Sequence, residues 1–381
     1  MPVRQPTLEA CVPDPGNGYD RSRTFEIPDE AAYRPPSILL QWHITERCNL
    51  RCAHCYQESY SRPDPSLEAL LGILHQFTDM LQSWNRGCSP GREGDRARRV
   101  VPGQITLTGG EPLLHADFFP LLEAISRLRP SIHFSVLTNG SVIDQGTAAR
   151  LRSLRPAFVQ ISLEGTEGRH DEIRGPGSYG AALAGIDNLV KAGIRTLISF
   201  TAHKANFRDF PEVAKIGQKL GVTRVWADRL IPNGSGSDLD LLTPSETAEF
   251  LRIMQETASR GKRAGSGTEI AMHRALQFLA AGGHPYSCQA GNSLITIMPD
   301  GELLPCRRMP VRVGNVLEEP LSVLYQKGKL FQKLRDEKRI SRGCADCIFA
   351  ALCRGGLRCL AYAVKGDAFA ADPGCPLARH N

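Results

Sequence analysis

Three cysteines near the start of the sequence, Cys48, Cys52 and Cys55, have the spacing C-x3-C-x2-C. Three thiolates that converge from one loop can hold a four-iron cube and leave one iron without a protein ligand, free to bind a substrate. A zinc site completed by His43 or His54, or a set of unrelated thiols, is the alternative. Zinc motifs usually come as two pairs with x2 spacing, so this spacing favours the iron-sulfur cluster.

A second group of seven cysteines lies after residue 285, at Cys288, Cys306, Cys344, Cys347, Cys353, Cys359 and Cys375. The chain has twelve cysteines in 381 residues, and the other two, Cys11 and Cys88, are treated as ordinary thiols. The N-terminus lacks the apolar segment of a secretory signal, and no stretch approaches the roughly 18 apolar residues of a membrane span. We therefore expect a cytoplasmic protein with no membrane partner, whose reduced thiols bind metal rather than form disulfides.

The net charge of +6, from 46 Lys and Arg against 40 Asp and Glu, is too mild to indicate a nucleic-acid partner. The basic residues are concentrated in residues 86–99 and 327–342. These two runs are either solvated loop and helix faces or a contact surface for an acidic peptide or protein.

The elements that must position the first three cysteines alternate between strands and helices. Apolar runs predict strands at 38–45, 104–108, 132–140, 157–163, 196–202 and 223–230. Amphipathic patterns predict helices that open at Asp64-Pro65, follow residue 112, and cover about 144–154, 178–192 and 209–220. This alternation predicts a parallel sheet with right-handed crossovers, either a barrel segment or a doubly wound sheet.

The composition changes along the chain and suggests four parts. We expect an extended tail at 1–36, a strand-helix domain at 37–235, a helical linker region at 236–285 and a small Cys-rich domain at 286–381. The capping box Thr243-Pro244-Ser245-Glu246 predicts a helix over roughly 244–260, and Pro299-Asp300-Gly301 predicts a hairpin turn. The Cys-rich part has few large apolar residues, so we expect metal to hold it together.

A second motif, Thr108-Gly109-Gly110-Glu111-Pro112, stands at the end of the second predicted strand, where ligands bind in parallel α/β folds. The glycines permit close backbone approach, and Glu111 can accept an ammonium group. Alone, the motif is compatible with an ordinary strand-to-helix turn. Together with the cysteine triad at the end of the neighbouring strand, it is specific.

These motifs together resemble the radical S-adenosylmethionine (SAM) superfamily. The matching segments are ITERCNLRCAHCY at 44–56, TLTGGEP at 106–112, LTNG at 137–140, ISLEG at 161–165 and HDEIRG at 170–175. The resemblance implies an α/β fold, a partial (β/α)6 TIM-like barrel followed by a small Cys-rich iron-sulfur domain. It also implies that a 4Fe-4S cluster on the cysteine triad binds SAM and, with electrons from a partner such as flavodoxin or ferredoxin, cleaves it to a 5′-deoxyadenosyl radical.

The resemblance further implies which residues contact SAM: Gly109, Gly110, Glu111, Asn139, Ser162, Glu164, Arg174 and His54. The two glycines and Glu111 would hold the methionyl amine. Ser162, Glu164 and Arg174 are candidates for the ribose and the carboxylate, against the alternatives of a strand-end hydroxyl, a helix-start carboxylate and a surface ion pair. His54 would pack near the adenine.

The C-terminal cysteines, with MPDGELLPC at 298–306, GNV at 314–316 and CRGG at 353–356, resemble the SPASM domain, which carries two auxiliary 4Fe-4S clusters. The resemblance assigns one cluster to Cys344, Cys347, Cys353 and Cys375, and the other to Cys288, Cys306 and one more cysteine from the 353–359 turn. The family pattern places that cysteine at 357, where this chain has Leu357. Cys359 is the expected substitute and would leave one iron open; an unstable cluster or zinc is the alternative.

The SPASM resemblance implies an enzyme that modifies a peptide or protein, as in the maturation of a ribosomally synthesised peptide. The short tail leaves no room for a leader-binding domain, so a separate leader-binding protein is a candidate partner. The alternatives are a small-molecule or tetrapyrrole substrate, a formylglycine-generating sulfatase maturase and, remotely, a zinc-binding scaffold. The sequence assigns no general acid or base; Asp228 and Arg229, at the end of the sixth strand, suit either substrate contact or a structural ion pair.

Overall fold

The computed structural model describes residues 33–86 and 100–379. The expected tail at 1–36 lies outside the described residues except for its last four positions. Cys11, Cys88 and nearly all of the basic run at 86–99 also lie outside them.

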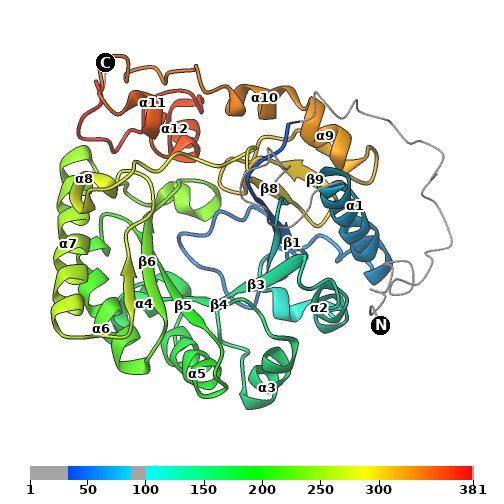
Figure 1. Cartoon of the computed structure of the whole chain (residues 1–381). Coiled ribbons are helices and arrows are strands. Elements are labelled where there is room, and N and C mark those ends of the chain that lie inside the picture. Colours follow the sequence, from blue (N-terminus) through cyan, green and yellow to red (C-terminus); the bar gives the residue numbers. More distant parts are fainter. Residues whose placement is uncertain (1–32, 87–99, 380–381) are drawn as a thin grey trace, which may run out of the picture.

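Six parallel strands form the centre of one sheet and follow each other in chain order. They are β1 (Ile38–His43), β2 (Gly103–Thr108), β3 (Ile132–Thr138), β4 (Val159–Ser162), β5 (Thr196–Ala202) and β6 (Arg224–Arg229). A doubly wound sheet would reverse its strand order at a switch point, and this one does not. The strands lie along an arc with the helices on its outer side (Figure 1), which confirms the predicted partial (β/α)6 barrel.

Both edges of the barrel sheet are extended by later segments. β7 (Glu269–Ala271) pairs in parallel with β6, and β8 (Leu294–Ile297) pairs in parallel with β1. β9 (Glu302–Leu304) and β10 (Gly314–Asn315) continue the β1 edge with antiparallel pairing. Gly301, with φ +83°, turns the chain between β8 and β9, so the predicted hairpin turn is confirmed. The Cys-rich region therefore begins inside the barrel sheet, which the sequence did not indicate.

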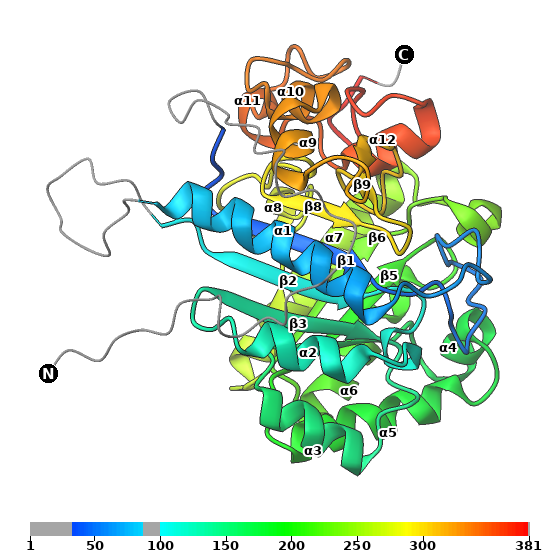
Figure 2. The ribbon, with the colours of Figure 1, turned by 90° about the vertical axis from the view of Figure 1, so that its right-hand side faces the viewer.

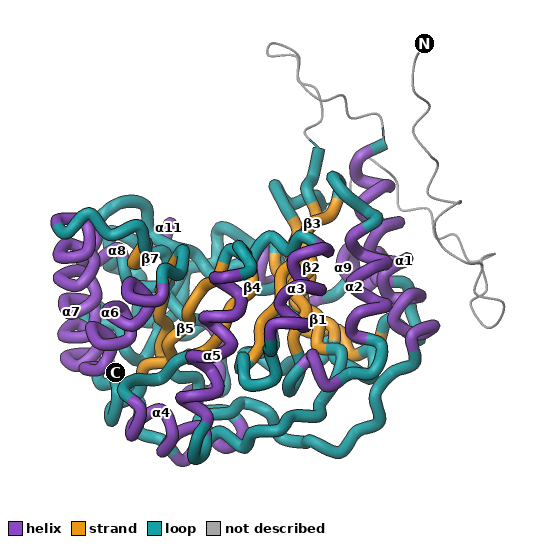
Figure 3. The backbone as a smooth tube through the Cα atoms, turned by 90° about the horizontal axis from the view of Figure 1, so that it is seen from below, coloured by secondary structure: helices purple, strands orange, loops and turns teal. Residues whose placement is uncertain are grey.

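The helices before residue 265 lie around the outside of the barrel, as Figure 3 shows from below; one follows each strand, except that α4 and α5 both follow β4. They are α1 (Leu67–Asn85), α2 (Phe118–Ser126), α3 (Gln145–Leu154), α4 (Glu167–Arg174), α5 (Ser178–Lys191), α6 (Phe210–Leu220) and α7 (Pro244–Arg263). α4 was not expected. α1 begins later than predicted because Ser66 is its N-cap, accepting a hydrogen bond from the Ala69 N–H at 3.2 Å. The predicted capping box of α7 is present, with Thr243 and Glu246 bonded reciprocally.

The C-terminal segments lie across the opening between the two edges of the arc (Figures 1 and 2). Their helices are short: α8 (Phe278–Ala281), α9 (Leu321–Lys327), α10 (Lys329–Arg335), α11 (Ala350–Cys353) and α12 (Arg358–Lys365). No helix in the described ranges is both long enough and apolar enough to cross a bilayer.

The basic run at 327–342 is only partly a solvated face. Arg335, at the end of α10, lies 4.0 Å from the ring centroid of Tyr325 and 4.4 Å from that of Tyr33. Its Nε donates to the Gly291 carbonyl at 2.9 Å. This arginine therefore packs the start of the described chain against the C-terminal helices.

The two faces of the barrel strands differ in chemistry because side chains alternate across a strand. The face toward the helices is apolar and buried, with Leu40, Trp42, Ile105, Phe134, Ile161 and Ile198 in one core. The inner face carries mainly polar side chains at paired positions, together with three leucines and one indole: Gln41, Thr106, Ser135, Gln160, Ser162, Ser199, Leu39, Leu137, Leu197 and Trp226. An inner wall that mixes polar and apolar side chains suits a ligand held at the open edge of the barrel.

Candidate iron-sulfur and cofactor site

The loop after β1 carries the first three cysteines at the carboxyl edge of the sheet. Backbone N–H groups point at two of the sulfurs: Leu50 N lies 3.5 Å from Cys48 Sγ, and Gln57 N lies 3.4 Å from Cys55 Sγ. Burial, opposed by Arg174 and assisted by the other two thiols, raises the pKa of Cys52 to about 11. Thiols with N–H donors aimed at sulfur fit iron, because coordination deprotonates them and hydrogen bonds to sulfur tune the cluster.

The two glycines of the second motif allow this loop to lie directly on the strand end. A Cβ at Gly109 would come within 2.4 Å of the Thr45 carbonyl oxygen, and one at Gly110 within 2.3 Å of the Arg47 carbonyl oxygen. Gly110 N donates to Thr45 O at 2.9 Å, and Glu111 N donates to Arg47 O at 2.7 Å. The close backbone approach expected of the two glycines is therefore made to the cysteine loop itself.

Glu111 is fully buried and held by the end of the next strand. Its carboxylate accepts hydrogen bonds from the Thr138 hydroxyl at 2.8 Å and the Asn139 N–H at 2.8 Å. Burial raises its pKa to about 7, while these hydrogen bonds act in the opposite direction. The Asn139 side chain in turn donates to Asn49 on the cysteine loop at 2.9 Å. Glu111 and Asn139 are therefore both placed beside the cysteine triad.

Three of the remaining predicted cofactor residues meet on the other side of the cysteine loop. Glu164 Oε1 accepts from Arg174 Nη2 at 2.6 Å and lies 3.2 Å from His54 Nε2. Arg174 Nη1 lies 3.8 Å from Cys52 Sγ. Although burial acts to raise it, Arg174 and His54 hold the pKa of Glu164 well below its usual range. The pair is not on the surface, because the Glu164 and Arg174 side chains are only 1% and 10% exposed.

Ser162 lies apart from this cluster, on the inner wall of the barrel. It is at the end of β4, and its hydroxyl is 3.2 Å from that of Ser199 on β5. The structure therefore brings His54, Glu164 and Arg174 together and leaves Ser162 as a neighbouring strand-end hydroxyl.

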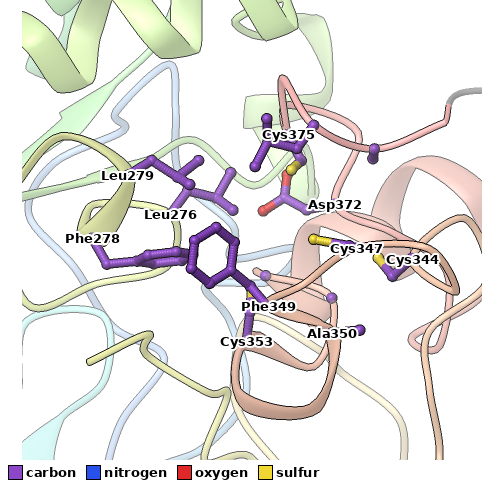
Figure 4. A pocket seen from close by; sticks show the side chains of 14 residues that line it. Leu276, Phe278, Leu279, Cys344, Cys347, Phe349, Ala350, Cys353, Asp372 and Cys375 are labelled. Atoms are coloured by element: carbon purple, nitrogen blue, oxygen red, sulfur yellow. The ribbon is translucent and has the colours of Figure 1, made fainter. Parts of the chain in front are cut away.

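Four of the C-terminal cysteines line one pocket (Figure 4): Cys344, Cys347, Cys353 and Cys375. Phe278 and Phe349 form its apolar side. Burial raises the pKa of Cys353 to about 11, opposed by hydrogen bonds from the backbone N–H groups of Gly355 and Gly356. None of the ten described cysteines is in a disulfide. The set assigned to one auxiliary cluster thus converges on a single apolar pocket.

The other three cysteines also converge. Burial and the nearby Cys306 and Cys288 thiols raise the pKa of Cys359 well above its usual value. Leu357, at the position of the missing cysteine, is 2% exposed and packs in the same apolar cluster as Cys359. α12 begins directly after Leu357, so the first turn of this helix carries Cys359 to the other two thiols.

No three His, Cys, Asp or Glu side chains in residues 33–86 and 100–379 are grouped to hold a single metal ion. The fit of the three cysteine sets to iron-sulfur clusters rests instead on thiol chemistry, shared pockets and N–H donors.

Asp228 and Arg229 do not form an ion pair with each other. Arg229 donates twice to Asp372, at 2.8 and 2.5 Å, and both side chains are buried. Asp372 lines the four-cysteine pocket and also accepts the Leu357 N–H at 2.9 Å. Arg229 is thus structural: it ties β6 to the Cys-rich region.

Asp228 pairs instead with two arginines that the sequence did not single out. Its Oδ2 accepts from Arg308 at 2.7 Å and from Arg274 at 3.0 Å. Burial opposes ionisation, but the two arginines lower the pKa of Asp228 to about 2. One carboxylate against two guanidinium groups leaves positive charge between the inner wall and the Cys306 and Cys359 thiols. Arg308 could have been suspected from the sequence only because it stands two residues after Cys306. No feature of the sequence pointed to Arg274.

A part-barrel with thiols, buried carboxylates and N–H donors at the carboxyl edge of its strands defines an iron-sulfur protein of the α/β partial-barrel class. A family model described as the radical SAM superfamily matches residues 42–216, and one described as an iron-sulfur cluster-binding domain, SPASM, matches residues 288–348. The chain therefore belongs to the radical SAM superfamily and carries a SPASM domain. Its cofactors are accordingly S-adenosylmethionine and 4Fe-4S clusters. The second match ends before Cys353, Cys359 and Cys375.

Two curated relatives match nearly the whole chain. The AdoMet-dependent heme synthase of Methanosarcina barkeri is 26% identical over 88% of this chain and 95% of its own length. The mycofactocin maturase MftC of Mycolicibacterium smegmatis is 29% identical over 89% of this chain and 82% of its own length. Their names differ in the product, so similarity alone does not define the substrate class.

The solved structure of SuiB from Streptococcus suis bound to S-adenosylmethionine has the same fold. Its TM-score is 0.70 at 16% identity, over 89% of this chain and 77% of SuiB. The structure of SuiB bound to the precursor peptide SuiA matches with a TM-score of 0.68 at 17% identity, over 88% of this chain and 75% of SuiB.

Replacing Arg174 by Met should destabilise the protein by about 3–5 kcal/mol, because buried Glu164 would lose its permanent cation and keep only His54 as a partner. Urea unfolding under anaerobic conditions measures this. The control is Arg169→Met on the same helix, which removes solvent-accessible pairs with Glu172 and Asp209 and should change stability by less than about 0.5 kcal/mol. If both substitutions lower the free energy of unfolding by the same small amount, the Arg174–Glu164 pair does not stabilise the protein as a buried ion pair.

Replacing Asp372 by Asn should lower the free energy of unfolding by about 3–5 kcal/mol, since it leaves Arg229 buried and unpaired. Iron bound per chain should fall in the same variant, because Leu357 and Cys375 lose their fixed positions. Asp367→Asn, which removes the exposed pair with Arg342, is the matched control. Unchanged iron content and stability in Asp372→Asn would show that the pair is dispensable.

Proposed function

We propose that this enzyme reductively cleaves SAM at a 4Fe-4S cluster on Cys48, Cys52 and Cys55, and that the resulting 5′-deoxyadenosyl radical abstracts hydrogen from a peptide or protein, as in the maturation of a ribosomally synthesised peptide. The observation that carries the proposal is the convergence of this triad, buried Glu111 and the Glu164-Arg174-His54 cluster at one edge of the polar barrel. A reducing partner such as flavodoxin or ferredoxin would supply the electron.

Each side chain at this edge has a distinct part in holding SAM. Glu111, oriented by Thr138 and Asn139, accepts the methionyl ammonium beside Gly109 and Gly110. Arg174 neutralises Glu164 and keeps a guanidinium N–H directed at the cysteine loop, where it can bind the methionyl carboxylate. Glu164 and Ser162, which both lie at the carboxyl end of β4, offer acceptors for ribose hydroxyls, and His54 offers a ring face for the adenine.

The C-terminal cysteines would hold two auxiliary clusters. Cys344, Cys347, Cys353 and Cys375 supply four thiolates from one pocket. Cys288, Cys306 and Cys359 supply three to the cluster nearer the inner wall. Because Asp228 orients Arg274 and Arg308 beside this second set, the positive charge there suits a carboxylate of the substrate.

Peptide modification is favoured by two independent similarities: the mycofactocin maturase among the relatives, and SuiB, which binds a precursor peptide in the same fold. A separate leader-binding protein is part of the proposal. A tetrapyrrole substrate is the second candidate, because the Methanosarcina barkeri relative is a heme synthase of nearly equal coverage. No observation in the described residues favours a sulfatase maturase.

The substrate class can be tested with the reconstituted protein, SAM and dithionite under anaerobic conditions. Short peptides encoded beside the gene should give 5′-deoxyadenosine and a mass-shifted peptide, whereas a tetrapyrrole bearing propionate groups should stay unchanged. A shifted tetrapyrrole mass with unchanged peptides would establish the second candidate. Cys52→Ala is the control that should abolish both products; absence of 5′-deoxyadenosine from the unaltered protein with every substrate would refute the proposal.

SAM affinity should depend on pH through Glu111. Its pKa is raised to about 7, so the carboxylate is protonated as the pH falls through 7 and loses its attraction for the ammonium. Affinity should drop about tenfold between about pH 8 and about pH 6, as measured by equilibrium dialysis. Glu111→Gln should bind more weakly at the higher pH and lose this dependence; an unchanged profile in that variant would assign the dependence to another group.

A further inference from the structure

One buried guanidinium in the Cys-rich region has no counter-ion. Arg358, the first residue of α12, is 2% exposed, and its Nε and Nη1 have no hydrogen-bond partner. No carboxylate among the described residues is within ion-pair distance of it. A buried, unpaired charge costs several kcal/mol, so such a group needs a negative partner close by.

The groups around Arg358 identify that partner. Its side chain lies 5.1 Å from the ring centroid of Phe369, and the charged or titratable groups that act on it electrostatically are Cys288, Arg354 and Arg339. Two of these three are cations. The Cys288 sulfur is therefore the group that can carry the compensating negative charge, which it does when it is a thiolate bound to iron.

The start of α12 places this cation beside the auxiliary site. The Leu357 N–H is held by Asp372 at 2.9 Å, which fixes where the helix begins. Cys359 packs in one apolar cluster with Cys288, Cys306 and Phe369, and Arg358 lies over the Phe369 ring of that cluster. The same turn of helix thus supplies a ligand and a positive charge to one site.

We propose that Arg358 raises the reduction potential of the auxiliary cluster on Cys288, Cys306 and Cys359. In this role Arg358 does not bind the cluster but stabilises, by its positive charge, the electron added to it. The inference rests on the ligand set given under the proposed function. Reduction adds one negative charge to the cluster, and a cation in a low-dielectric surrounding stabilises the more negative form.

The test is an anaerobic redox titration of the reconstituted full-length protein, followed by electron paramagnetic resonance. At the potential where the wild-type auxiliary cluster is half reduced, Arg358→Met should lower the ratio of reduced to oxidised cluster at least tenfold, a shift of about 59 mV for one electron. Arg358→Lys should restore most of the ratio. The signals of the other two clusters should not move.

Arg339→Met is the matched control, because Arg339 lies over the same Phe369 ring but its side chain is 41% exposed. Solvent screens an exposed charge, so this variant should titrate like the wild type. An unchanged ratio in Arg358→Met would overturn the proposal. If Arg358→Met loses the cluster, retention of the cluster in Arg358→Lys supports the role of charge, and its loss there too overturns it.

Iron content separates this inference from the ligand assignment. Cys359→Ala should reduce bound iron by about one cluster per chain, as measured by iron analysis. If Cys359→Ala retains the full iron content, the assumed ligand set is wrong. If it loses iron while Arg358→Met keeps the wild-type potential, the ligand set stands and only the role of Arg358 fails.

Discussion

The buried ion pair between Arg229 and Asp372 is the interaction on which the arrangement of the barrel and the Cys-rich region depends. It joins the last strand of the six-stranded barrel to the segment before Cys375, and both partners are excluded from water. Asp372 also accepts the Leu357 and Gly374 N–H groups, so its two oxygens are fully used. Gly374 is required here, because a Cβ at that position would come within 2.2 Å of Arg229 Nη1. One carboxylate thus fixes Cys375 and the start of α12 relative to the barrel.

Two buried carboxylates at the carboxyl edge of the barrel, Glu164 and Glu111, also depend on their partners for their ionisation state. Glu164 is kept ionised by Arg174 and His54, whereas Glu111 has only neutral hydrogen-bond donors and a pKa near 7. The two carboxylates both lie beside the cysteine loop but differ in their hydrogen-bond partners. Glu164 already has its cation, so its side chain is fixed before a ligand arrives. Glu111 has no cation in hydrogen-bond contact, so an ammonium group can complete its surroundings.

Much of the barrel and of the first site could be predicted because the signals are local. Strand and helix periodicities, the cysteine spacing and the Gly-Gly-Glu-Pro turn each lie within a few residues. The contacts that the sequence did not reveal join residues far apart: Arg229 and Asp372 are 143 positions apart, and Asp228 and Arg308 are 80 apart. The parallel pairing of β8 with β1 is equally non-local. Single residues of these pairs carry no pattern, so only the folded chain identifies them.

The replacement of a cysteine by Leu357 has a physical consequence that the surrounding charges help to explain. In the proposed ligand assignment, the site on Cys288, Cys306 and Cys359 offers three thiolates where the pocket of Cys344 offers four, so a cluster there would carry less negative charge from the protein. The chain nevertheless places Arg274, Arg308 and Arg358 near these thiols, against the single carboxylate of Asp228. These arginines supply more positive charge than an oxidised cluster needs. The surplus favours the reduced cluster, or the binding of an added anionic ligand, over the oxidised cluster. By contrast, the four-cysteine pocket is lined by apolar side chains and Asp372, so the two auxiliary sites should differ in potential, with the three-thiolate site the easier to reduce.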